Sequence, residues 1–158
     1  MTRMRDGTDT SEVWIQGALA APVLVLIVAA IASSFFRELG PDDVKIAASD
    51  LRSASSTTRQ LLEQYQRGEL TKRYYAAHIH LLEDEVSAQY NALNTASVDD
   101  TIRNEQAETR DLAARLDDVL KRLDDETADL DSSRMDALQM TRKFATIEER
   151  LRMKVQSQ

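Results

Sequence analysis

The sequence contains no cysteine, so histidines and carboxylates are the side chains that could bind a metal ion or transfer protons. The two histidines are His78 and His80. A spacing of two residues on a helix turns side chains about 200° apart, so this pair cannot hold one metal ion together. Asp84 follows His80 by four residues and would share its helix face, but a zinc site would still lack two ligands. We therefore expect no metal site.

Several carboxylates stand side by side in the sequence, namely Asp42–Asp43, Asp117–Asp118 and Asp124–Asp125. Neighbouring helix residues diverge in direction, whereas the carboxyl pair of a glycosidase converges across a cleft. The 4 glycines form neither a phosphate-binding loop nor a dinucleotide fingerprint, and no Gly-x-Ser-x-Gly elbow is present. We therefore predict a protein that is not an enzyme and has no cofactor.

Charge and composition narrow the class further. The chain has 158 residues with a net charge of −7, which disfavours a nucleic-acid partner because phosphate would be repelled. Aromatic residues make up 5% and there are 2 prolines, so long helices are favoured and a thick core is not. We predict an all-α fold: a single N-terminal transmembrane helix followed by an elongated helical bundle or coiled coil.

An uncharged run of residues 13–36 follows a polar leader of residues 1–12. About 20 apolar residues suffice for a helix to cross the hydrocarbon core of a bilayer. Aromatic side chains favour the membrane interfaces, and here they flank the run: Trp14 at one end, Phe35 and Phe36 at the other. The run predicts a signal-anchor in a single-pass membrane protein, with the lipid bilayer as its first partner.

Two alternatives to a retained anchor remain open. The Ala30-Ile31-Ala32 sequence before Ser33 has the small-x-small form of a signal-peptidase site, so the run could be a cleaved signal. A soluble core helix is the other alternative. The leader is not net basic, and lysines and arginines nearly balance across the run, so the positive-inside rule leaves topology open. A short leader before one span favours placing the helical domain outside the cytoplasm.

Beyond a linker at residues 37–43, residues 44–96 predict a helical hairpin or bundle segment. Apolar residues recur at helical spacing, weakened by the serines and threonines of residues 52–59. Gly68 is the expected bend, and Thr71 the expected N-cap of the next helix. That helix has two apolar stripes, so we expect it to be buried on both sides. One stripe contains Tyr75, Ile79, Leu82, Val86, Tyr90 and Leu93, and the other Tyr74, Ala77, Leu81 and Ala88.

Residues 97–158 carry one heptad register to the end, which predicts a single long coiled-coil helix. Ser97 and Asp100 have the spacing of a capping box at its start. Glu105, Glu126 and Ser133 are polar residues at inward positions. The seam that we expect to pair with another chain comprises Leu116, Val119, Leu123, Leu130, Ala137, Met140, Phe144, Ile147 and Leu151. Attractive Asp129–Arg134 and Lys143–Glu148 matches favour a parallel second copy.

These features predict a membrane-anchored coiled-coil protein that acts as a structural or protein-interaction scaffold in the cell envelope. Its partner would be a second copy or another coiled-coil envelope protein. Small divisome coiled-coil proteins and inner-membrane spanins share this architecture, although no motif selects either. The alternative is a helical-bundle sensor or ligand-binding module that works with a separate membrane signalling partner.

Overall fold

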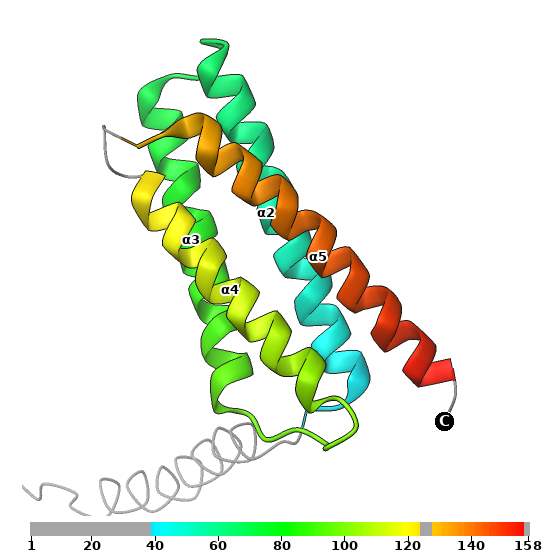
Figure 1. The fold of residues 1–158 in the computed structure, drawn as a ribbon. Coiled ribbons are helices and arrows are strands. Elements are labelled where there is room, and N and C mark those ends of the chain that lie inside the picture. Colours follow the sequence, from blue (N-terminus) through cyan, green and yellow to red (C-terminus); the bar gives the residue numbers. More distant parts are fainter. Residues whose placement is uncertain (1–38, 124–127, 157–158) are drawn as a thin grey trace, which may run out of the picture. The chain divides into compact units, whose positions relative to one another are not determined.

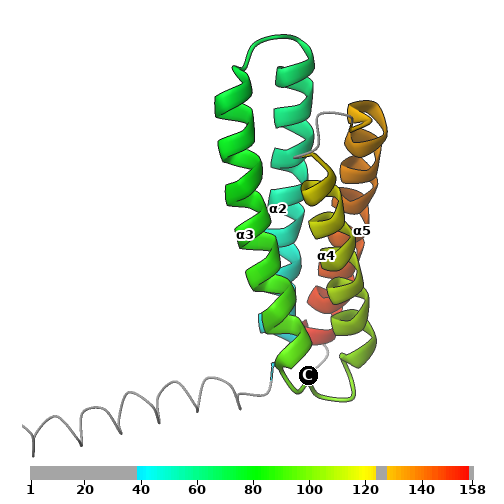
Figure 2. The same cartoon turned by 90° about the vertical axis from the view of Figure 1, so that its left-hand side faces the viewer.

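The computed structural model describes residues 39–123 and 128–156, and these residues form an up-and-down bundle of four helices (Figure 1). The helices are α2 (Pro41–Gln66), α3 (Lys72–Thr95), α4 (Arg103–Leu123) and α5 (Leu130–Gln156). Each helix runs antiparallel to the next, and α5 returns to pack along α2 (Figure 2). The predicted all-helical bundle is therefore confirmed.

The predicted transmembrane helix at residues 13–36 lies outside the described residues, as do Trp14, Phe35 and Phe36. In the two described stretches, none of the helices combines the length and apolarity needed to cross a bilayer. The bundle that begins after Arg37 is a compact unit separate from the preceding residues.

The predicted turn at Gly68 and the cap at Thr71 are confirmed. Gly68 has φ of 71°, a conformation that glycine adopts without steric cost. Its amide donates to the Tyr65 carbonyl at 2.9 Å, and the Glu69 amide donates to Gln64 at 3.0 Å, which is the Schellman pattern of helix ends. The Thr71 hydroxyl then accepts from the backbone N–H at position 74 at 3.2 Å.

The expectation that α3 is buried on both sides is wrong. Ile79 and Val86 of its first stripe lie in the core, but Leu81 of the second stripe is 63% exposed and Tyr74 is 48% exposed. A bundle of four helices needs one buried face from each helix, and α3 meets this requirement with its first stripe. The second stripe is left on the surface.

The prediction of one long helix over residues 97–158 is also wrong. Helix α4 ends at Leu123, α5 begins at Leu130, and the two run antiparallel, with Glu108 paired to Arg150. Because α5 runs back along α4, the apolar residues of the heptad repeat pack against one another within a single chain. Ser97 does not cap α4, which begins six residues later; its carbonyl instead accepts the Leu39 amide at 2.9 Å.

Two of the serines and threonines that we expected to weaken α2 are buried, and one of them contacts α5. Ser55 and Thr58 are fully buried, and the hydroxyls of Ser55 and Thr141 lie 2.8 Å apart. Thr58 and Thr141 also donate to the carbonyls of Ala54 and Ala137, each at 2.9 Å. Small side chains with satisfied hydroxyls allow two helix backbones to approach closely.

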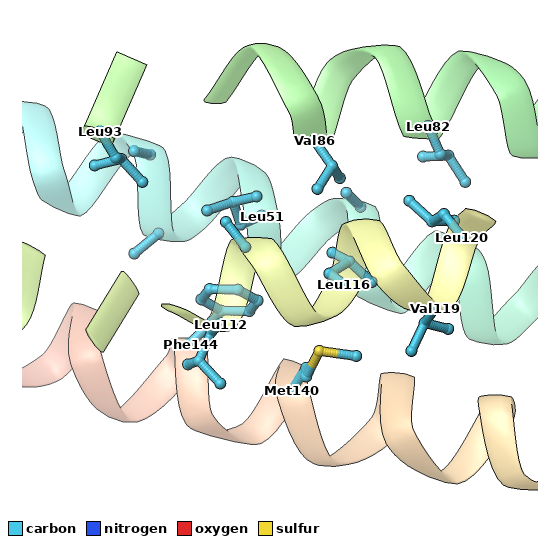
Figure 3. Packing of buried hydrophobic residues seen from close by; sticks show 14 of the residues in the cluster. Leu51, Leu82, Val86, Leu93, Leu112, Leu116, Val119, Leu120, Met140 and Phe144 are labelled. Carbon is cyan, nitrogen blue, oxygen red and sulfur yellow. The ribbon is translucent and has the colours of Figure 1, made fainter. Parts of the chain in front are cut away.

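The core runs along the bundle axis and receives side chains from all four helices (Figure 3). Val86 of α3 points towards α4, and Leu116 and Leu112 of α4 lie on the inner side facing Leu51 and Phe144 (Figure 3). Leu116 and Phe144 have no exposed surface. Because this core closes within one chain, folding of the bundle does not require a second copy.

Candidate interaction surface

The seam proposed for pairing between chains lies inside the bundle. Eight of its nine residues are buried in the core, and Leu130 packs against the core from its edge; the buried eight are Leu116, Val119, Leu123, Ala137, Met140, Phe144, Ile147 and Leu151. The structure therefore brings the seam residues together, but with each other and with α2 and α3 rather than with another chain. An interaction surface has to be sought among exposed residues.

The charged matches that favoured a parallel second copy have partners within the chain. Glu148 pairs with Arg52 of α2 at 3.0 Å, and Arg134 pairs with Asp131 at 3.3 Å. Asp129 accepts the backbone amides at positions 131 and 132, each at 3.1 Å, and so begins α5 as its N-cap. Of the four side chains, Lys143 alone makes neither an ion pair nor a hydrogen bond with a described residue.

Ion pairs connect α4 to α5 along one edge of the bundle. Glu105 pairs with Lys154 at 2.7 Å, Glu108 pairs with Arg150, and at the far end Arg122 lies 3.5 Å from Asp136. Burial alone would raise the pKa of Glu105. The hydrogen-bonded Lys154 ammonium, a backbone hydrogen bond and the nearby Arg150 outweigh burial and hold that pKa below its ordinary value.

At one level of this edge, a cation of α4 lies opposite a cation of α5. Counting seven residues from the Glu108–Arg150 pair along both antiparallel helices places Arg115 opposite Lys143. Neither makes an ion pair with a described residue. Like charges that face each other repel, so this level lacks the ion pair that α4 and α5 make at the levels on either side.

A groove of about 280 Å³ opens between α4 and α5 at this level. Its apolar floor consists of Leu112, Val119 and Met140, each at most 5% exposed. Its rim consists of Arg115, Asp118, Arg122, Asp136, Gln139 and Lys143. An apolar floor inside a charged rim is the composition of a binding site for an amphipathic partner.

The outer face of α3 is a second exposed apolar surface. Tyr74 stacks on His78, whose Nδ1 donates to the Tyr74 carbonyl at 3.0 Å. Leu81 stands one turn further along, followed by Asp84 and Glu85, which are exposed and make no ion pair with a described residue. The helical spacing of its apolar residues indicates this stripe in the sequence. Whether the stripe faces the core or solvent depends on the positions of the other helices, which the spacing does not give.

The histidines do not form a metal site in the described part of the chain. His80 lies 3.6 Å from Glu83, and His78 is engaged with Tyr74. Across residues 39–123 and 128–156, no three potential metal-ligating side chains come together.

Comparisons with protein-family models, curated proteins and solved structures give no match for this chain. The exposed surfaces of the bundle are therefore the features that point to a function.

Proposed function

We propose that this protein is a membrane-anchored scaffold whose helical bundle binds other proteins in the cell envelope, including copies of itself. The observation that supports this most directly is the groove between α4 and α5, which leaves three large apolar side chains under a rim with two unpaired cations. A surface of this kind suits a helical partner, because a helix can supply apolar and acidic side chains on one face.

The anchor in this proposal is the uncharged run of residues 13–36. Its length matches a bilayer core, and its flanking aromatic residues suit the two interfaces. In this proposal the bundle lies on the extracytoplasmic side. Confinement of all copies to one membrane would raise their effective concentration and allow weak contacts to assemble them.

The test of the anchor uses the full chain expressed in cells. Retention in the membrane fraction after carbonate extraction, with an intact mass that includes residues 13–36, is the expected result. Protease added from outside the cytoplasmic membrane should digest the bundle. A mature N-terminus at Ser33, or release by carbonate, would contradict the anchor and with it the proposed function.

A ligand-binding sensor is the second candidate, and the same groove is the observation that favours it. Its volume of about 280 Å³ is just below the range typical of small-molecule pockets. A sensor would be stabilised against heat by a small amphipathic anion at low concentration. A scaffold would show no such shift and would instead yield crosslinks to protein neighbours in the membrane.

A further inference from the structure

We propose that copies of this protein associate side by side in the membrane, with the outer face of α3 from one copy seated in the α4–α5 groove of the next. This inference deepens the proposed function, on which it rests for the common orientation of the copies. The proposed contact joins two surfaces that every copy carries. One is the groove, and the other is the α3 face formed by Tyr74, Leu81, Asp84 and Glu85.

The two surfaces are complementary in chemistry. The groove offers an apolar floor and two cations, Arg115 and Lys143, that make no ion pair with a described residue. The α3 face offers Leu81, 63% exposed, and two carboxylates, Asp84 and Glu85, that make no ion pair with a described residue. Seating Leu81 over the floor removes the exposed surface of this leucine from water, whereas the floor, already nearly covered, contributes little. The two carboxylates supply anions for the two cations.

The two surfaces also lie at the same height along the bundle. The side-chain amide of Gln89 in α3 donates a hydrogen bond to Asp50 of α2 at 3.3 Å, so these two residues lie at the same height. Because α2 and α3 are antiparallel, five residues forward along α2 and five residues back along α3 bring Ser55 level with Asp84. Ser55 bonds Thr141 of α5 at 2.8 Å, which is two residues from Lys143 and therefore about 3 Å from its height.

The level of Leu81 agrees as well. The side-chain amide of Gln106 in α4 donates a hydrogen bond to the Leu93 carbonyl of α3, so these two residues lie at the same height. Because the helices are antiparallel, twelve residues forward along α4 and twelve residues back along α3 bring Asp118 level with Leu81. Asp118 lies in the groove beside Val119, one of its floor residues. A neighbour at the same height thus brings Leu81 to the floor and its carboxylates to the two cations.

Equal height is a geometry that anchoring in one membrane permits. Each copy would enter its bundle from Leu39, at the same end, so neighbouring bundles would point in the same direction. The contact joins two different surfaces and is therefore heterologous: each copy has one α3 face and one groove, and repetition produces rows or closed rings. An isologous pair of α3 faces would leave the groove cations unpaired.

Crosslinking of the full-length protein in membranes tests this arrangement. The natural chain has no cysteine, so Ala77→Cys marks the α3 face and Gln139→Cys marks the groove without background. Two differently tagged chains, each with one cysteine, are co-expressed and treated with a short bismaleimide. The expected product joins the Ala77→Cys chain to the Gln139→Cys chain in excess over either chain joined to itself.

Charge reversal distinguishes this contact from chance encounters. Asp84→Lys with Glu85→Lys, or Arg115→Glu with Lys143→Glu, should each lower the mixed crosslink roughly tenfold, because attraction becomes repulsion. All four reversals in both chains should restore it. The control for the groove variant, Arg67→Glu with Arg142→Glu, changes the net charge equally at exposed residues that do not line the groove, and should leave the crosslink unchanged.

Three results would overturn the inference. They are self-crosslinks of Ala77→Cys that dominate, a mixed crosslink unaffected by either reversal, and failure of the four reversals to restore a crosslink in chains with native circular dichroism. Loss of the anchor would contradict the proposed function alone. In that case the same crosslinks, measured on the purified full chain in solution, still decide whether these two surfaces meet.

Discussion

Replacement of Leu116 by alanine should destabilise the bundle strongly, whereas the same replacement at Leu81 should not. Both are leucines within helices, so the change in side chain and in helix propensity is the same. Leu116 has no exposed surface and lies in the core near Leu51 and Val86 (Figure 3). Leu81 is 63% exposed. The comparison isolates burial as the cause of any difference.

The expected magnitude follows from the burial. A fully buried leucine replaced by alanine loses its transfer free energy and leaves a cavity, a loss of about 3 kcal/mol in free energy of unfolding. For a bundle of this size, that corresponds to a fall in Tm of roughly 12 °C. The exposed leucine should change the free energy of unfolding by less than about 0.5 kcal/mol.

The assay is urea denaturation of a fragment of residues 38–158, followed by circular dichroism at 222 nm. It should be run at a protein concentration low enough for the fragment to be monomeric. An unchanged slope with a lower midpoint is the expected result for Leu116→Ala. A loss at Leu81→Ala as large as that at Leu116→Ala would show that the outer face of α3 is covered within the chain, and would refute the exposure on which the proposed assembly depends.

Three further predictions concern single positions in the same fragment. Gly68→Ala should lower the free energy of unfolding by about 1 kcal/mol through backbone strain alone, because φ is 71° and no atom lies within 4 Å of the added methyl; no loss would contradict the Schellman turn. Burial, with a smaller contribution from Tyr65, raises the pKa of Tyr75 to about 12, so the folded state should lose stability as pH rises from 10 to 12. Its buried hydroxyl makes no hydrogen bond with a described residue, so Tyr75→Phe should be neutral or stabilising at pH 7 and should remove its share of the alkaline loss; an unchanged alkaline slope would contradict this. The lowered pKa of Glu105 stabilises the folded state above pH 4.5 and this contribution is lost as pH falls through the folded value, so Glu105→Gln should flatten the acid limb of stability against pH.

The outcome for α3 shows the limit of periodicity as evidence. A spacing of three and four residues correctly placed two apolar stripes on this helix, but the spacing is the same whether a stripe faces the core or solvent. The position of α3 at a corner of the bundle decided that Ile79 is buried and Leu81 is not. The sequence therefore indicated the apolar stripe on the outer face of α3, but it did not indicate that this stripe is exposed to solvent.

The groove was not predicted. Its residues had been identified in part as a seam, with Val119 and Met140 among the expected interior positions. Arg115 and Lys143 lie opposite each other only because α4 and α5 pack antiparallel. Neither residue shows any feature in the sequence that would mark it as unpaired.

The sequence by itself determined the helical class, the turn at Gly68, the cap at Thr71 and most of the buried residues in the last 60; Gln106, Ala113 and Leu120 are buried as well and were not predicted. The predicted features follow from local backbone preferences and from a side-chain period that any helix shares. Only the tertiary structure decided that this stripe is buried against the same chain. Leu116 and Phe144 occupy the same heptad position whether the chain continues as one helix or folds back. The heptad position therefore cannot distinguish packing against a second copy from packing within one chain. The antiparallel packing of α4 and α5 buries that stripe without the loss of freedom that association of two chains requires.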